Sequence, residues 1–282
     1  MKQIKEAYLT GERALFHGLD LNVQDCTFAD GESPLKESKN IKITNSTFKW
    51  KYPLWYSKDI YCSHTTLLET ARSGIWYTND ITMKNCFIQA PKTFRKCSGV
   101  TLFNVQLPNA EETFWNCKDI ELKNVSANGN YFGMNSENIS ASDFILSGNY
   151  SFDGAKNIEI HNAKLLSKDA FWNCENVTVY DSLIIGEYLG WNSKNVRFVN
   201  CTIDSLQGMC YMENVVLENC KLLNTTLAFE YSSVKADIVS SVDSITNPYE
   251  GMIRAEEIKE IIFDETYVDT TKTKIEVREL VA

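Results

Sequence analysis

Aliphatic residues return along this chain at a nearly constant spacing. The separations are 20, 19, 21, 19 and 20 residues, and then 19 residues six times. Two residues after each aliphatic position comes a second apolar residue, and the position between them is usually polar. This alternation predicts a half-buried β-strand in every repeat. The aliphatic positions, called the anchor column, are Leu21, Ile41, Ile60, Ile81, Val100, Ile120, Ile139, Ile158, Val177, Val196, Val215 and Val234.

Each repeat contains two further short apolar segments. A second apolar pair lies five and seven residues after the anchor, as in Val125 with Ala127. A third apolar position lies six residues before the anchor and predicts a third strand. A repeat of about twenty residues with three short strands is typical of a solenoid. The third position holds Leu15, Leu35, Leu54, Ile75, Phe94, Phe114, Gly133, Phe152, Phe171, Gly190, Met209 and Ala228.

Asparagine and aspartate mark the ends of the predicted strands. Ten of the twelve residues immediately before an anchor are Asn or Asp, and so are ten of the twelve residues four positions after it. These residue types tolerate the left-handed backbone that a sharp corner needs, and they bond their own backbone. Stacked in register, their side chains also form hydrogen-bonded ladders. The two columns therefore predict two corners in every repeat.

The columns together predict an all-β fold, a right-handed single-stranded parallel β-helix with about twelve coils of 19–21 residues. The periods of hexapeptide and pentapeptide helices are missing, and so is the helical return segment of leucine-rich repeats. Right-handed winding follows the general handedness of parallel crossovers. We expect one domain over residues 1–282, with an N-terminal cap at 1–14, coils at 15–241 and a C-terminal cap at 242–282.

Composition narrows the classes of partner. The chain has 282 residues and a formal net charge of −9, which argues against binding to nucleic acid. No apolar run has the length of a signal peptide or a membrane span, so a cytoplasmic protein without membrane contact is expected. The nine cysteines are then expected to be reduced thiols that fill the core. CxxC is absent and the three histidines form no cluster, so neither a metal nor another cofactor is expected.

The column five residues before the anchor holds five of the six tryptophans and also admits charged residues. We expect it to face solvent as an aromatic strip, with Arg95 between Trp76 and Trp115. One interpretation is mutual support by stacking and cation–π contacts. A second is a sugar-binding platform, because exposed apolar strips often mark binding sites. A third is a core column turned inward by a local bulge. The column consists of Phe16, Lys36, Trp55, Trp76, Arg95, Trp115, Met134, Asp153, Trp172, Trp191, Cys210 and Phe229.

A more polar column lies three residues before the strip and is expected to line a groove with it. Glycoside cleavage in such a groove needs two carboxyl groups, about 5 Å apart for retention or roughly 6.5–9.5 Å for inversion. A lyase would instead use Arg95 or Lys92 as its base. Charged residues at solenoid corners are, however, usually just solvated. The polar column holds Tyr52, Ser73, Lys92, Glu112, Tyr131, Tyr150, Asp169 and Tyr188, and the two candidate charge clusters are Asp153, Asp169 and Glu187, and Glu69, Arg72, Lys92, Glu111 and Glu112.

Three stretches carry a resemblance to a known family: Gly11-Glu12-Arg13-Ala14-Leu15-Phe16, Gly31-Glu32-Ser33-Pro34-Leu35-Lys36-Glu37 and Trp50-Lys51-Tyr52-Pro53-Leu54-Trp55-Tyr56. The chain resembles, over nearly its whole length, a bacterial family of unknown function with a pectin-lyase-like right-handed β-helix. The resemblance implies the fold, and it implies no activity and no catalytic residue. Neither the paired aspartates of β-helical polygalacturonases nor the calcium-and-arginine set of pectate lyases is evident.

The leading functional hypothesis is binding of an oligosaccharide or uronic acid through the Trp/Tyr strip. Whether the chain is also an enzyme, a polysaccharide lyase or glycoside hydrolase, is left open, with Asp153, Asp169 and Glu187 as candidate catalytic residues. The alternative is a non-catalytic scaffold that self-associates, for instance as a homodimer, through the aromatic flank. The expected binding residues are Trp55, Trp76, Arg95, Trp115, Trp172, Trp191, Tyr188, Glu112 and Lys92.

Overall fold

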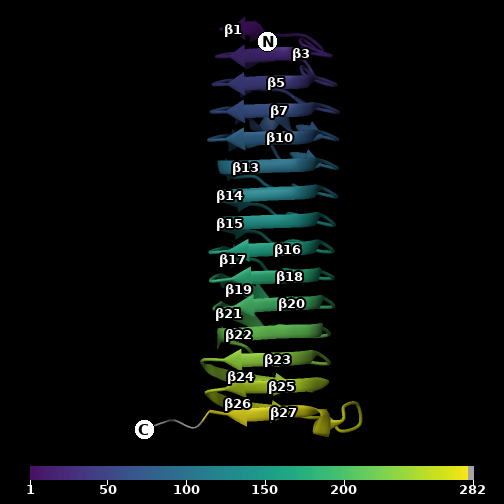
Figure 1. The fold of residues 1–282 in the computed structure, drawn as a ribbon, viewed down its shortest axis with the longest axis vertical. Helices are drawn as coiled ribbons and strands as arrows, with labels where there is room; N and C mark the ends of the chain where they lie inside the picture. Colours follow the sequence, from purple (N-terminus) through teal and green to yellow (C-terminus); the bar gives the residue numbers. More distant parts are fainter. Residues whose placement is uncertain (279–282) are drawn as a thin grey trace. The chain divides into compact units, whose positions relative to one another are not determined.

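The computed structural model describes residues 1–278, and these form β-strands joined by corners, with two short 3-10 helices. The chain divides into two compact units, Met1–Ile145 and Leu146–Ala282. Within each unit, strands of successive coils pair in parallel (Figure 1). The chain is therefore an all-β parallel β-solenoid, as the repeat predicts. The expectation of a single domain stays a prediction.

In the first unit, one long strand per coil carries the anchor column, and shorter strands follow or precede it. The strand β15 (Glu137–Ser147) crosses the boundary between the units. The anchor strands are β1 (Lys2–Lys5), β3 (Leu19–Gln24), β5 (Lys39–Thr44), β7 (Lys58–Ser63), β10 (Asn79–Lys84), β13 (Ser98–Leu107) and β14 (Lys118–Asn128). The short elements are β2 (Tyr8–Leu9), β4 (Thr27–Phe28), β6 (Thr47–Phe48), β8 (Thr66–Leu67), η1 (Glu69–Ala71), β9 (Ile75–Trp76), β11 (Phe87–Ile88) and β12 (Phe94–Arg95).

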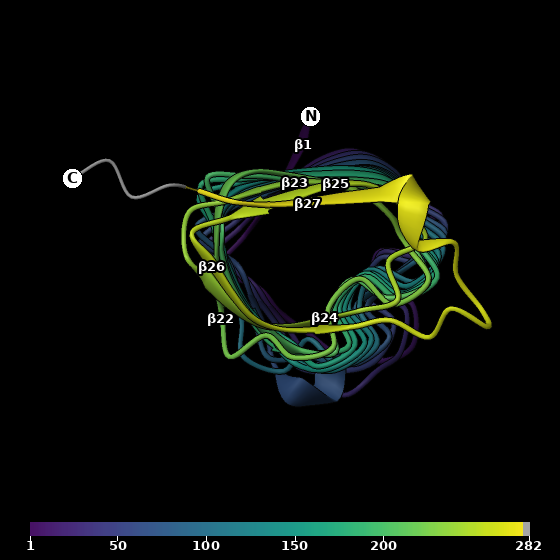
Figure 2. The ribbon, with the colours of Figure 1, turned by 90° about the horizontal axis from the view of Figure 1, so that it is seen from below.

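The second unit repeats this plan. Its anchor strands are β16 (Lys156–His161), β18 (Glu175–Tyr180), β20 (Lys194–Val199), β22 (Glu213–Leu223), β23 (Ser233–Ile238), β25 (Glu250–Ala255) and β27 (Thr273–Val277). The following strands are β17 (Lys164–Leu166), β19 (Leu183–Glu187), β21 (Thr202–Leu206), β24 (Ser241–Thr246) and β26 (Glu257–Ile262), and η2 (Thr270–Lys272) precedes β27. In Figure 2, β23, β25 and β27 overlie one another along one side of the coil.

The anchor column is confirmed residue by residue. In the first unit Leu21 pairs with Ile41, Ile41 with Ile60, and the register continues through Ile120. In the second unit it runs from Ile158 to Val234. The anchor strands cross the front of Figure 1 from right to left while the chain advances from its N-terminal to its C-terminal end, so the winding is right-handed.

Coils extend further than the repeat analysis predicts. In the segment expected to be an N-terminal cap, Lys2 to Lys5 pair in register with β3. In the segment expected to be a C-terminal cap, β25 pairs with β23 and β27 pairs with β25. The chain therefore has about fifteen coils rather than twelve. The extra coils escaped notice because they lack the aliphatic anchor: Val234 is aligned with Gly251, and Gly251 with Thr273.

The predicted corners adopt the left-handed backbone. Asn40, Asp119 and Asn195 have φ values of 55°, 55° and 53°. Their side chains also form the expected ladders, since the Nδ2 atom of Asn195 donates to Oδ1 of Asn176 at 3.0 Å and Nδ2 of Asn214 donates to Oδ1 of Asn195 at 2.9 Å. The two residues flanking the tryptophan strip are left-handed as well, as at Tyr52 and Tyr56, which the repeat analysis did not predict.

The inward side chains form a core of aliphatic and phenylalanine residues in each unit. Phe94 and Phe114 stack at 4.6 Å between ring centroids in the first unit, and Phe152 and Phe171 stack at 5.3 Å in the second. All nine cysteines are buried and unpaired, as expected of core-filling thiols. Within residues 1–278, no helix is long and apolar enough to cross a membrane.

Candidate functional site

The tryptophans of the strip lie half-buried at the corner that leads into each anchor strand. Each indole N–H donates to a backbone carbonyl of the next coil, and this locks the plane of the ring. The distances are 2.6 Å from Trp55 to Ser73, 2.8 Å from Trp76 to Lys92, 2.7 Å from Trp115 to Tyr131, 3.0 Å from Trp172 to Tyr188 and 2.6 Å from Trp191 to Gln207. The strip is therefore a ladder fixed to the backbone, neither core nor fully exposed.

The flat faces of these rings largely meet one another. Trp55 and Trp76 stack at 5.1 Å with an interplanar angle of 8°, and Trp172 and Trp191 stack at 6.0 Å with an angle of 11°. The predicted sandwich of Arg95 is confirmed, because its guanidinium lies 4.6 Å from the Trp76 centroid and 4.5 Å from that of Trp115. The contacts of mutual support are thus present. Sugar binding by this strip stays a prediction.

The charged groups of the first unit beside the strip are engaged in ion pairs. The carboxylate of Glu112 accepts from Arg95 at 3.1 Å and from Lys92 at 3.0 Å. Glu111 accepts the backbone N–H of Asn130 at 2.9 Å. The remaining two members of this predicted cluster, Glu69 and Arg72, are exposed at η1. These contacts hold Arg95 between the indoles and leave its Nε atom, which is buried, without a hydrogen-bond partner among residues 1–278.

The three candidate catalytic carboxylates lie on successive coils of the second unit. Asp153 accepts from the side-chain amide of Asn173 at 3.0 Å, and Glu187 pairs with Lys168 at 3.1 Å. Asp169 lies between their charges and is only 3% exposed. Burial, reinforced by the negative charges of Glu187 and Asp153, raises the pKa of the Asp169 carboxyl, while Lys168 and a hydrogen bond with Tyr150 oppose the rise. The predicted cluster therefore exists, but its central carboxyl is shielded from solvent.

Replacing Asp169 by Asn is expected to raise the melting temperature near pH 7 by about 2–4 °C, the shift of about 1 kcal/mol in a chain of this size. Because folding raises the pKa of this carboxyl, its contribution to stability is complete below the ordinary Asp pKa of about 4 and is lost as pH rises through the folded-state pKa. The amide carbonyl of Asn still accepts from Tyr150. Thermal unfolding between pH 4 and pH 8 should give a flatter curve for Asp169→Asn than for the wild type.

The control for this measurement is Asp153→Asn, since the amide keeps an acceptor for Asn173 on a half-buried corner. We expect its melting curve to follow that of the wild type. A lower melting temperature for Asp169→Asn at every pH would mean that the charge of Asp169 stabilises the fold, contrary to the argument from burial.

A second aromatic cluster, absent from the predicted site, lines a hollow of about 360 Å³ in the second unit. It forms where the chain enters four neighbouring anchor strands, β20, β22, β23 and β25. Tyr211 and Tyr231 stand on left-handed corners with φ values of 58° and 49°. We call this hollow the tyrosine groove; it is lined by Asn192, Ser193, Lys194, Tyr211, Met212, Glu213, Tyr231, Ser233, Tyr249 and Glu250.

The rings in the tyrosine groove are tilted, not stacked. Tyr211 and Tyr231 are 5.7 Å apart at 42°, and Trp191 meets Tyr211 at 5.1 Å and 59°. Tilted rings leave part of each face open, whereas the parallel indoles of the strip cover one another. Tyr211 is 42% exposed and Tyr249 is 49% exposed. Burial and the charge of Glu230 raise the pKa of the Tyr211 hydroxyl, which donates to Glu230 at 3.2 Å.

The tyrosine groove could have been found from the sequence by following tyrosines past the last regular repeat. Tyr211, Tyr231 and Tyr249 are 20 and 18 residues apart, close to one coil each. They fall four, three and two residues before the anchor position, so they never share a column. Column analysis therefore separated residues that the shortened last coils bring together. The expected residue Tyr188 is nearby, packed edge-on against Trp191 at 5.2 Å, with Lys168 over its ring.

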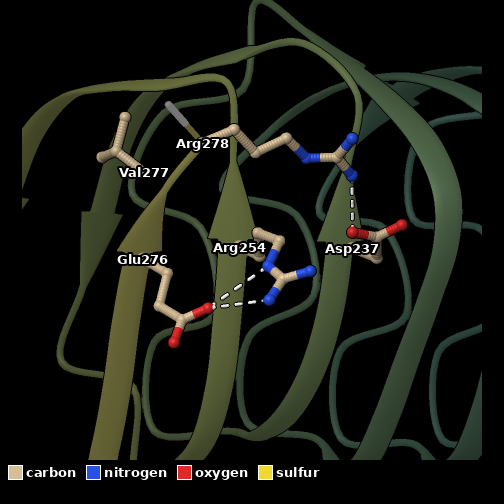
Figure 3. A pocket seen from close by; sticks show the side chains of 5 residues that line it. All are labelled: Asp237, Arg254, Glu276, Val277 and Arg278. Atoms are coloured by element: carbon tan, nitrogen blue, oxygen red, sulfur yellow. Dashed lines mark hydrogen bonds and ion pairs between the residues drawn. The ribbon is translucent and has the colours of Figure 1, made fainter. Parts of the chain in front are cut away.

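A larger hollow of about 650 Å³ lies over β23, β25 and β27, and its charges are paired with one another (Figure 3). Arg254 donates twice to one oxygen of Glu276, at 3.2 and 3.1 Å, and Arg278 reaches across to Asp237 at 2.5 Å. A ligand here would have to break these pairs. Across residues 1–278, no three His, Cys, Asp or Glu side chains are grouped so as to hold a metal ion.

Residues 2–276 match the model of a family described as a protein of unknown function, DUF3737. The chain belongs to this family. The resemblance drawn from the sequence is thereby confirmed for the family and the β-helical fold. No protein with a curated description matches the chain significantly.

Solved structures similar to the chain include a surface adhesin and an epimerase. The adhesin PfbA of Streptococcus pneumoniae is 11% identical, over 89% of this chain and 71% of its own, with a TM-score of 0.37. The A-module of the mannuronan C-5 epimerase AlgE4 of Azotobacter vinelandii is 9% identical, over 99% of this chain and 89% of its own, with a TM-score of 0.34. Likenesses this distant carry no argument about activity.

Family membership leaves the chemistry to be argued from the chain's own residues. The tryptophan strip offers mainly ring edges, the carboxylates of both clusters are hydrogen-bonded or ion-paired, and the hollow over β27 is filled with paired charges. The tyrosine groove combines open aromatic faces with polar groups at its rim, which is the usual make-up of a small-ligand site.

Proposed function

We propose that this protein binds an oligosaccharide in the tyrosine groove of its second unit. The observation that supports the proposal is the set of tilted, partly open rings of Tyr211, Tyr231 and Tyr249 around one hollow. Apolar C–H faces of pyranose rings pack well on such aromatic faces, and rigid aromatic side chains contribute large contact areas at low entropic cost.

Polar groups at the rim suit the hydroxyl groups of a sugar. Asn192 presents an amide, and the Lys194–Glu213 pair, 2.6 Å apart, presents both donors and acceptors. Towards β18 the groove meets Trp191, which stacks on Trp172, so that the aromatic surface continues beyond the hollow. A chain of several sugar units therefore fits better than a single sugar.

The proposal is for binding and does not include cleavage. Asp169 is almost completely buried, and Asp153 and Glu187 are held by Asn173 and Lys168. A glycosidase needs two carboxyl groups that flank the bond to be broken. The expected catalytic set is better explained as support for the corner than as a reaction centre.

The test is a glycan array followed by titration of the intrinsic fluorescence, which reports on the groove through the contact of Trp191 with Tyr211. For an oligosaccharide found to bind, Tyr211→Leu and Tyr231→Leu are each expected to weaken binding at least about tenfold, or about 1.4 kcal/mol. The matched control is Tyr56→Leu, an exposed tyrosine of the first unit, which should leave affinity unchanged.

Two outcomes would contradict the proposal. One is that no glycan binds, and the other is that Tyr56→Leu weakens binding as much as Tyr211→Leu does. Light scattering on the same proteins tests the scaffold alternative. A stable dimer that dissociates on Tyr211→Leu would make the tyrosine groove an interface between copies of the chain rather than a sugar site.

A further inference from the structure

The first unit shows how this fold covers exposed tyrosine rings with its own cations. Tyr56 and Tyr77 stack at 4.6 Å with an angle of 3°. The ammonium of Lys36 lies 5.6 Å from the Tyr56 centroid, and that of Lys96 lies 5.6 Å from the Tyr77 centroid. An ammonium group over a tyrosine face is attracted by the electrons of the ring. Each tyrosine of this pair therefore already has a cation of the chain as partner.

The tyrosine groove lacks this intramolecular arrangement at two of its three rings. Within residues 1–278, no Lys or Arg side chain lies over the ring of Tyr211 or Tyr231, whereas the ammonium of Lys272 lies 5.5 Å from the centroid of Tyr249. Tyr211 and Tyr231 are also tilted against each other, so a wedge of aromatic surface is open between them. The groove thus presents aromatic faces to which the chain supplies no cation.

Negative charge surrounds these open rings. Glu213 is neutralised by Lys194 at 2.6 Å, and Glu230 accepts the hydroxyl of Tyr211 at 3.2 Å. Glu250 lines the groove, is exposed, and forms no ion pair with any residue of the described part of the chain. Three carboxylates therefore face two ammonium groups, those of Lys194 and Lys272. Such a field attracts a cation and repels an anion.

We infer that the ligand of the tyrosine groove carries an organic ammonium group, seated against Tyr211 and Tyr231 and balanced by Glu250 and Glu230. The inference rests on the groove named in the proposed function and adds the charge of its ligand. An amino-bearing saccharide and a quaternary ammonium compound share this chemistry. A uronic acid, which the sequence alone suggested, has the opposite charge and is disfavoured.

The experiment compares ligands that differ in charge and little else. Binding of a glucosamine tetramer, its N-acetylated counterpart, a galacturonate tetramer and choline is measured by calorimetry below the pKa of the amine. We expect the glucosamine tetramer to bind about tenfold more tightly than the N-acetylated tetramer. The galacturonate tetramer should bind most weakly, and high salt should weaken binding of the amine alone.

Three variants localise the effect. Glu250→Gln should remove most of the preference for the amine while leaving the N-acetylated tetramer unaffected. Lys272→Gln should tighten binding of the amine, because it removes a competing cation from Tyr249. Glu137→Gln removes a carboxylate that is paired with Lys118 in the first unit and serves as the matched control, with affinities equal to those of the wild type.

The outcomes separate this inference from the proposed function. Equal affinity for the amine and N-acetylated tetramers, or a preference for galacturonate, overturns the inference and leaves oligosaccharide binding standing. Binding of choline without any saccharide supports the cation site and overturns the oligosaccharide proposal. Failure of all four ligands to bind overturns the inference, and the glycan array then decides the proposed function on its own.

Discussion

Replacing Phe114 by Ala is expected to lower the free energy of unfolding by about 3–5 kcal/mol. The side chain is completely buried, stacks on Phe94 at 4.6 Å and meets Phe132 edge-on at 5.3 Å. Truncation removes the transfer free energy of a benzyl group and leaves a cavity in a coil whose backbone is held by hydrogen bonds to both neighbours, so it cannot collapse. Urea unfolding followed by circular dichroism measures the loss.

The matched control is Phe87→Ala in the same unit. Phe87 is 36% exposed and points outward from β11, so its truncation should cost no more than about 1 kcal/mol. Because the two variants change the same residue type, a comparable loss at both positions would mean that the core stack is not the source of the stability.

The fold could be predicted because the forces that build it act on single columns. Leu21, Ile41 and Ile60 must all be apolar because each takes the same inward place in successive coils. Asn195 and Asn214 recur because a left-handed corner and an amide ladder both favour Asn at one position. Periodicity in the sequence reports these requirements directly, so strands, corners and register follow from it.

The candidate site was predictable only in part, because ring orientation leaves no periodic signal. The column that holds Trp55 and Trp76 could be identified, and so could the sandwich of Arg95. Whether a ring shows its face or its edge depends on the acceptor of its N–H group, a backbone carbonyl of the next coil. A backbone carbonyl belongs to every residue, so the sequence does not reveal which one receives the bond.

The tyrosine groove escaped prediction for a related reason. Its last two coils are spaced by 17 and 22 residues between Val234, Gly251 and Thr273, so the regular step of 19 no longer finds them. The anchor of the first of these coils is Gly251, a residue that no aliphatic pattern includes. The reason for glycine is steric: a Cβ atom added to Gly251 would lie 1.9 Å from the carbonyl oxygen of Val234.

Gly251→Ala is accordingly expected to lower the free energy of unfolding by about 3 kcal/mol or more, since the added Cβ forces β25 away from β23 and the φ of 120° is strained for alanine. Gly11→Ala is the control, because its φ of 88° is also positive but a Cβ there meets no atom within 4 Å, so only about 1–2 kcal/mol should be lost. Tyr249 and Glu250 precede Gly251 directly, so a displaced β25 also opens the tyrosine groove. Measured at a temperature where it is still folded, Gly251→Ala should therefore bind the ligand of the groove at least about tenfold more weakly than Gly11→Ala. Equal stability of the two variants would show that the close approach of β25 to β23 is not what selects glycine, and equal affinity would place the binding residues away from Tyr249 and Glu250.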